Sequence, residues 1–302
     1  MNILHSMYGQ AIGDMLGEPV EGMSHEEIAT RWHVITDFIS PPSITDDTMM
    51  THLVARSVCK IGMVDRHHIA AEFLKNRARI PRMGPTTAHA LSELASDPNF
   101  MPTTGTTNGA AMRAPAIAWL CPTEAVVRNT IEASLATHGA PVAIAGACAI
   151  ACAVSQAING ANVRTIIRAG VRGASEVSGE LASRITESVV LASRVSLRDA
   201  IKIIGCGIET VEAVPAVFAI IAEYPDFRDG VLAAVNLGGD TDTIAGMVGA
   251  ITGGMPDAAI PSGWITACAG SVGAMIEESW DCVQRLRDPA VYTHHRHKLR
   301  FL

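Results

Sequence analysis

Two short acidic clusters, nearly two hundred positions apart, constrain this chain more than any other feature of its sequence. The first is Thr45-Asp46-Asp47-Thr48, and the second is Gly238-Gly239-Asp240-Thr241-Asp242-Thr243. Adjacent carboxylates repel one another, so a folded protein holds them together only where protons, basic partners or cations neutralise them. Neither cluster contains Lys or Arg. Together they predict two halves of one metal site, which requires residues 1–302 to fold as a single domain.

The donor atoms of the two clusters indicate which metal they bind. Carboxylate and hydroxyl oxygens without Cys or His suit hard cations such as Mg²⁺, Mn²⁺ or Ca²⁺ and argue against zinc. We therefore expect Mg²⁺ or Mn²⁺. For either cluster taken alone, the alternative is an ordinary acidic helix cap, because Asp and Thr are common at that position.

Both clusters stand where a helix is expected to begin. Residues 49–56 are typical of a helix with Thr45 as its N-cap, which places Asp46 and Asp47 in the first turn, where the helix dipole favours carboxylates. In the second cluster the two glycines allow a tight turn and Asp240 can cap. Residues 244–251 then continue as an apolar helix.

A third pattern lies near the N-terminus, where Gly9, Gly13 and Gly17 recur at helical spacing and permit close backbone packing before a Gly-Glu-Pro break. With these residues added, the chain resembles the ADP-ribosylglycohydrolase family. Gly13-Asp14-x-x-Gly17 followed by Glu21, then Thr-Asp-Asp-Thr, then Gly-Gly-Asp-Thr-Asp-Thr occur in the family's order. The resemblance runs from about residue 3 to about residue 280.

The resemblance implies an all-α fold, a compact orthogonal bundle of many helices with a central dinuclear metal site. It implies two divalent cations, Mg²⁺ or Mn²⁺, held by Thr45, Asp46, Asp47, Asp240, Asp242 and Thr243. The expected catalytic residues are Glu21, Asp47 and Asp242. Glu21 would carry a proton or switch between metal ligand and substrate contact, whereas the aspartates would act as ligands rather than bases.

The family's substrate-binding segments also have counterparts here. Thr107-Asn108-Gly109-x-x-Met112-Arg113 is similar to the family's Asn-Gly-x-x-Met-Arg segment, and Thr137-His138 is similar to its Thr-His. The resemblance implies that Thr107, Asn108, Gly109, Arg113 and His138 border the substrate pocket, with Gly84 and Thr86 as further candidates. Other interpretations are a turn before a helix for Asn108-Gly109, a cap or core histidine for His138, and a plain loop for Gly84 and Thr86. One departure from the family is Thr106-Thr107, which stands where many members have a Gly-rich stretch.

The resemblance implies hydrolysis of an N- or O-glycosidic bond at the anomeric carbon of ADP-ribose, with ADP-ribosylated protein side chains such as arginine, or a small ADP-ribosyl or ribosyl compound, as the partner. One alternative is a small-molecule N-ribosidase, since aromatic residues make up only 4% of the chain and offer no obvious stacking platform for adenine. Another is a catalytically silent structural or binding relative. The net charge of −7 gives no reason to expect nucleic acid as a partner.

The remaining sequence indicates a helical protein of a reducing compartment. Residues 139–158 form a 20-residue stretch without a charge, long enough to cross a bilayer, but its Ala, Gly and Cys content is more typical of a helix buried among helices, and no membrane association is expected. The seven cysteines form no Cys-x-x-Cys pair, and we expect Cys148 and Cys152 to be buried and unreactive. The first residues do not resemble a signal peptide, so we expect a cytoplasmic protein.

Overall fold

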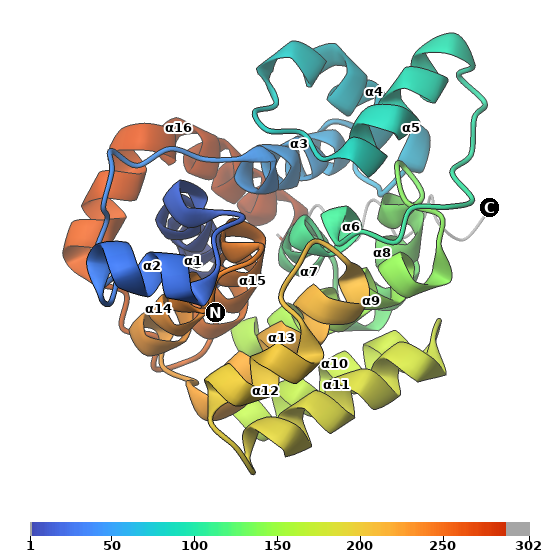
Figure 1. Cartoon of the computed structure of the whole chain (residues 1–302). Coiled ribbons are helices and arrows are strands. Elements are labelled where there is room, and N and C mark those ends of the chain that lie inside the picture. The colour runs from blue at the N-terminus through green and yellow to red at the C-terminus, as the bar shows by residue number, and fades with distance from the viewer. Residues whose placement is uncertain (1, 288–302) are drawn as a thin grey trace.

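The computed structural model describes residues 2–287, and every regular element in this range is a helix (Figure 1). The expected all-α fold is thereby confirmed. Residues 33–39, the one segment with a weak strand pattern, form no strand. Only two isolated β-bridges occur within residues 2–287, Ser24 with Gly238 and Thr107 with Glu209. The basic segment 293–298, interpreted from sequence as a solvated tail, lies outside the described residues.

The described helices follow one another along the chain with short connections. Their bounds are α1 Ile3–Gly17, η1 Glu18–Val20, α2 His25–Trp32, α3 Asp46–Ile61, α4 Arg66–Asn76, η2 Arg77–Arg79, α5 Pro85–Ser96, α6 Gly109–Met112, α7 Pro115–Leu120, η3 Thr123–Ala125, α8 Val126–Ser134, α9 Pro141–Ile158, α10 Val163–Ser175, α11 Gly179–Ala192, α12 Leu197–Ile204, α13 Thr210–Glu223, α14 Phe227–Leu237, α15 Thr241–Gly253 and α16 Ser262–Arg287, the last with a kink at Val272.

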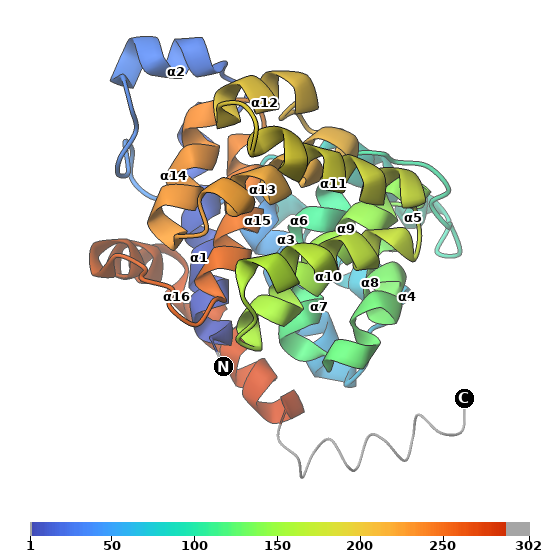
Figure 2. The same ribbon diagram turned by 90° about the horizontal axis from the view of Figure 1, so that it is seen from below.

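The helix pair α1 and α15 joins the two ends of the chain (Figures 1 and 2). The expected close packing of small residues is confirmed here. A Cβ atom built on Gly13 would lie 2.1 Å from the carbonyl oxygen of Ala245, and one built on Gly9 would lie 2.2 Å from that of Gly249. No side chain larger than hydrogen fits at these two contacts without displacing backbone. The pair therefore depends on glycine to bring its backbones together.

One hydrophobic core extends through the whole described structure, with buried members from Ile3 in α1 to Val283 in α16. This continuity supports a single domain over residues 1–302, which stays a prediction. Helix α9 lies inside that core, packed against α7, α8, α10 and α13. It is the one described helix apolar and long enough to span a membrane, and 78% of it is buried within the protein. We interpret it as a core helix.

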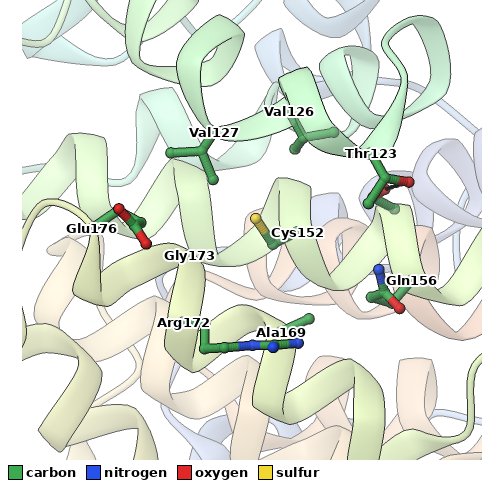
Figure 3. A pocket seen from close by; sticks show the side chains of 10 residues that line it. Thr123, Val126, Val127, Cys152, Gln156, Ala169, Arg172, Gly173 and Glu176 are labelled. Atoms are coloured by element: carbon green, nitrogen blue, oxygen red, sulfur yellow. Dashed lines mark hydrogen bonds between the residues drawn. The ribbon is translucent and has the colours of Figure 1, made fainter.

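The two cysteines of α9 differ in burial, contrary to expectation. Cys148 is fully buried, whereas Cys152 is half-buried and faces a pocket between α8, α9 and α10 (Figure 3). The polar groups of this pocket include Gln156, Arg172 and Glu176. Burial raises the pKa of the Cys152 thiol to about 11, so it remains protonated at neutral pH. The sequence did not reveal the pocket, because it depends on where α8 and α10 pack.

Helix starts follow the sequence signals in most cases. Ser24 forms a capping box with Glu27, and Ser196 accepts a hydrogen bond from the backbone N–H of Asp199. Thr123, interpreted from the sequence as a further helix start signal, does stand at a helix start. Thr123 is the first residue of the short helix η3, which follows Pro122, and its hydroxyl contacts Ser155 instead of a backbone N–H of α8.

Candidate metal centre and substrate pocket

The first half of the acidic centre is the N-terminus of α3. Thr45 is its N-cap and accepts a hydrogen bond from the N–H of Asp47 at 3.3 Å, which places Asp46 and Asp47 in the first turn, as predicted. Asp14 of α1 adds a second cap. Its carboxylate accepts hydrogen bonds from the backbone N–H groups of Thr45 and Thr48, both at 3.1 Å, and from the Thr48 hydroxyl at 2.5 Å. Asp14 thus fixes the start of α3 against α1.

The second half is the N-terminus of α15. Gly238 and Gly239 both have positive φ, 82° and 77°, and give the tight turn expected before this helix. Asp240 is the N-cap residue, but its side chain makes no capping hydrogen bond. It accepts one from the Asn108 amide at 2.5 Å instead. This contact ties the second cluster to the segment expected to bind substrate.

The two clusters meet in space, as the sequence predicts. The Thr243 hydroxyl of α15 donates a hydrogen bond to Asp47 Oδ2 of α3 at 3.2 Å, and the Thr45 hydroxyl donates to the same oxygen at 3.3 Å. Asp46, Asp47, Asp240 and Asp242 are all at most 8% exposed. Four carboxylates from opposite ends of the chain therefore share one nearly buried space.

Burial raises the pKa of every buried aspartate in the centre, and neighbouring carboxylates add to the effect at all of them except Asp14. Burial raises the pKa of Asp14 to about 6 and, together with the nearby charges of Asp14 and Asp240, that of Asp46 to about 7. The pKa values of Asp47 and Asp242 lie well above 3.8, first because of burial and then because each faces other carboxylates. Burial likewise raises the pKa of Asp240. The centre as it stands lacks positive charge.

Glu21 lies at the mouth of the centre. One carboxylate oxygen of Glu21 lies within 4.8 Å of an oxygen from each of Asp240 and Asp242, which suits joint coordination of a cation. Glu21 also accepts a hydrogen bond from Arg82 Nη1 at 2.7 Å, while Arg82 Nη2 contacts Glu18 Oε1 at 2.5 Å. Arg82 adopts a positive φ of 48°, unusual for a residue with a side chain. Its charge is already shared between two glutamates at the rim.

A pocket opens above the acidic centre. Of the predicted substrate contacts, Gly84, Thr107, Asn108 and Gly109 line it, together with the acidic residues. Pro85 and Thr87, from the predicted Gly84–Thr87 segment, and Met112, from the Asn108 motif, also line it. Arg82 and Ile208 complete the lining, and no sequence motif indicated either of them. The Gly84 N–H also donates to Asp46 Oδ2 at 3.3 Å, so the loop before α5 touches the centre directly.

The other three predicted substrate residues, Thr86, Arg113 and His138, do not line the pocket. Arg113 is 2% exposed and donates to the Gly109 carbonyl at 2.6 Å and to the Thr137 hydroxyl at 2.7 Å. Its guanidinium stacks over Phe73, 5.4 Å from the ring centre. These contacts hold the Asn108–Gly109 turn from below. A direct role of Arg113 in substrate binding stays a prediction, as it does for His138 and Thr86.

A chain of hydrogen bonds fixes the state of His138. Burial, and then the charge of Arg113, lower its pKa well below 6.5, so its ring is neutral. The Thr107 hydroxyl uses its proton to donate to Thr86 Oγ1, so it accepts from His138 Nε2, and Nδ1 of the neutral ring accepts from the Thr137 hydroxyl at 2.8 Å. Nε2 then donates to Thr107 Oγ1 at 3.0 Å, and Thr107 donates to Thr86 Oγ1 at 3.0 Å. The relay orients the Thr107 hydroxyl at the pocket wall.

The residues of the centre fit hard divalent cations. Their donors are carboxylate and hydroxyl oxygens, with no Cys or His among the described residues that line the pocket. Arg82 is the only Lys or Arg among those residues, and two glutamates engage it. A cluster of carboxylates with raised pKa values and no free basic partner is the electrostatic setting that bound cations relieve.

Comparisons with known proteins agree with this geometry. The ADP-ribosylglycohydrolase family profile matches residues 2–297. An uncharacterized protein of Archaeoglobus fulgidus is 30% identical over 275 residues, which cover 85% of this chain and 88% of the relative. YegU of Escherichia coli, also uncharacterized, is 30% identical over 291 residues, covering 84% and 87%. The ADP-ribosyl-dinitrogen reductase glycohydrolase of Rhodospirillum rubrum is 26% identical over 286 residues, covering 87% and 88%.

A solved structure described as an ADP-ribosylglycohydrolase-related protein complex matches the fold with a TM-score of 0.76 at 22% identity, over 95% of this chain and 98% of that chain. The helical fold is thus shared with that structure, and the matching family is of the glycohydrolase type. The chain belongs to the ADP-ribosylglycohydrolase family.

Proposed function

We propose that this protein is a metal-dependent hydrolase that cleaves the N- or O-glycosidic bond at the anomeric carbon of ADP-ribose, with ADP-ribosylated arginine side chains as the first substrate class. The observation that carries the proposal is the meeting of the two acidic clusters at the floor of a pocket whose wall is Thr107–Gly109. A charged floor with hydroxyl, amide and glycine backbone groups beside it suits a ribose with its hydroxyls turned toward the carboxylates.

The roles of the residues follow from their positions. Thr45, Asp46, Asp47, Asp240, Asp242 and Thr243 would hold two divalent cations, which when bound supply sites for the ribose hydroxyls and for a water of lowered pKa. The carboxylates stabilise positive charge that develops on the sugar ring as the glycosidic bond breaks. Glu21 lies at the rim, within reach of Asp240 and Asp242, and is the group placed to move a proton between the site and solvent.

A substrate panel tests the proposal. The purified protein is incubated with ADP-ribosyl-arginine, ADP-ribosyl-serine peptide and simple purine and pyrimidine nucleosides, each with Mg²⁺, Mn²⁺ or EDTA. We expect release of ADP-ribose from the arginine conjugate with metal and none with EDTA. No turnover of any substrate, by a protein that binds metal, would instead support the catalytically silent alternative.

One observation favours the nucleoside alternative. None of the described residues that line the pocket is aromatic, and its apolar contacts are Pro85, Met112 and Ile208. An adenine ring would find no stacking partner there. Faster cleavage of nucleosides than of ADP-ribosyl-arginine in the same panel would make the protein an N-ribosidase.

The raised pKa values of the aspartates predict how the metal-free protein responds to pH. Carboxylates whose pKa is higher in the folded than in the unfolded state stabilise the fold below the unfolded value, near 3.8, and that stability is lost as pH rises through the folded values, about 6 for Asp14 and about 7 for Asp46. We therefore expect the EDTA-treated protein to melt at a lower temperature at pH 8 than at pH 5.5.

Cations should reverse this trend, because they bind the ionised carboxylates. At about 100 times the dissociation constant, metal adds about 2.7 kcal/mol to the free energy of unfolding. Melting curves of the protein with EDTA and with saturating Mg²⁺ or Mn²⁺ at both pH values provide the measurement. Identical pH dependence with and without metal would contradict the assignment of these carboxylates as ligands.

A further inference from the structure

A second cluster of reactive side chains lies between α3 and α16, away from the acidic centre, where these helices pack side by side (Figure 1). It surrounds a pocket of about 150 Å³. The lining residues are His52, Arg56, Cys59, Lys60, Glu278, Ser279 and Arg285. None of them belongs to the site described above.

Two cysteine thiols meet at this pocket, one from each helix. The Cys282 thiol donates to the Ala55 carbonyl at 3.6 Å, one helical turn before Cys59. Arg285, three residues after Cys282, donates to the Cys59 sulfur at 3.1 Å, so Cys59 and Cys282 are neighbours across this helix contact. Cys59 is half-buried and faces the pocket, whereas Cys282 is 1% exposed. A small oxidant entering the pocket would therefore reach Cys59 first, with Cys282 directly behind it.

The surroundings of Cys59 favour its reaction. Arg285 Nη2 donates to Cys59 Sγ at 3.1 Å, so a fixed positive charge faces the sulfur and the negative charge that develops as it attacks peroxide. The other two cations of the pocket are already occupied, because Arg56 and Lys60 both pair with Glu72, at 2.9 and 2.7 Å. Arg285 is thus the cation available to the sulfur. Burial, and then the neighbouring Cys59, raise the pKa of Cys282, so Cys282 stays protonated and is not the thiol that attacks peroxide first.

We propose that Cys59 and Cys282 form a peroxide-sensitive dithiol pair, in which hydrogen peroxide oxidises Cys59 and Cys282 closes a disulfide between α3 and α16. The Cys59 sulfur attacks one peroxide oxygen and the O–O bond breaks, giving a sulfenic acid and, after protonation, water. The Cys282 sulfur then attacks the Cys59 sulfur, the S–O bond breaks, and the hydroxyl leaves with the Cys282 proton as a second water. The two thiols together lose two electrons, and these reduce one peroxide to two waters.

The bridge would join distant parts of the chain. It would anchor the C-terminal half of α3, whose first turn holds Asp46 and Asp47, to the last helix that the structure describes. Closing so long a loop restricts the unfolded chain, so the oxidised protein should be the more stable form. We expect a higher melting temperature after peroxide treatment, reversed by dithiothreitol.

The test treats the reduced full-length protein with hydrogen peroxide, blocks the remaining thiols with N-ethylmaleimide in denaturant, and maps the peptides by mass spectrometry without reduction. We expect a Cys59–Cys282 linked peptide, formed within one molecule. Cys282→Ser should abolish the link and trap Cys59 as a sulfenic acid that dimedone labels. Arg285→Gln should slow the reaction several-fold.

Cys152→Ser is the matched control, because Cys152 is also half-buried and lines a pocket, but it belongs to α9 rather than to α3 or α16 and should not affect the link. The proposal is overturned if peroxide leaves both thiols free, if it carries Cys59 to sulfinic acid without a bridge in the parent protein, or if other cysteines pair instead. Because the readout is covalent chemistry, it is independent of glycohydrolase activity.

Discussion

Asp242→Asn is expected to remain folded while its metal affinity and turnover fall by on the order of 100-fold, since changing even the outer partners of metal ligands costs about 10–100-fold. Asp242 is 3% exposed, and its Oδ1 accepts a hydrogen bond from the N–H of Thr243 at 2.9 Å. The carbonyl oxygen of Asn can accept the same bond, so the start of α15 keeps its geometry. What the substitution removes is the negative charge that a cation requires.

The sign of the stability change separates a metal ligand from a structural cap. Burial and the charges of Asp240 and Glu21 raise the pKa of Asp242, so its ionised form is costly in the metal-free protein. At pH 8 the metal-free Asn variant should therefore melt higher than the metal-free parent, and the order should invert with saturating Mg²⁺ or Mn²⁺. Melting curves, metal content and turnover are the measurements.

Asp226→Asn is the matched control for this experiment. Asp226 is an exposed N-cap of α14, accepting from the N–H of Arg228 at 2.9 Å, and Asn caps a helix about as well as Asp. That variant should match the parent in all three measurements. Normal metal content and full activity in Asp242→Asn would refute its assignment as a ligand.

Gly13→Ala is expected to lower the free energy of unfolding by about 3 kcal/mol, the upper part of the range for overpacked interiors. The added methyl carbon would lie 2.1 Å from the carbonyl oxygen and 2.4 Å from the carbonyl carbon of Ala245. Both are backbone atoms of α15, so the two helices must separate. Because Asp14 follows Gly13 directly, the same displacement should loosen the cap on α3 and reduce metal binding.

Gly246→Ala lies in the same helix pair and serves as its control. A Cβ atom there meets Gln10 O at 3.5 Å, an ordinary van der Waals contact. Replacing a helical glycine by alanine stabilises a helix by up to about 1 kcal/mol, so this variant should be as stable as the parent or more so. Chemical denaturation of the three proteins checks both values. A Gly13→Ala protein as stable as Gly246→Ala would show that the helices can separate at no cost.

The sequence predicted best what local signals determine. Thr45 and the aspartates after it indicate a helix start through local sequence alone, and glycines at helical spacing indicate close packing. Asp14 was not identified as part of the centre, although a single carboxylate in an apolar helix was the available signal. Its role depends on α3 crossing α1, which no local pattern encodes.

The residues of the pocket wall were also predicted only in part from the sequence. The motif around Asn108 correctly pointed to a segment beside the acidic centre, but it did not distinguish residues that face the pocket from those that support it. Asn108 contacts Asp240, whereas Arg113, only five positions on, turns under the wall to hold Gly109 and Thr137. Arg82 and Ile208 reach the pocket from irregular segments without a motif.

The contact between α1 and α15 has a consequence for biosynthesis. The Thr241 hydroxyl donates to the Gly17 carbonyl, 224 positions away along the chain. At translation rates of about 5–20 residues per second, α1 leaves the ribosome roughly 10–45 s before its partner helix exists. Through that interval the glycine face of α1 has no α15 to pack against, although Asp14 can already cap the start of α3. The glycine face of α1 therefore stays uncovered on the nascent chain until α15 is made. A chaperone would have the most surface to protect during this interval.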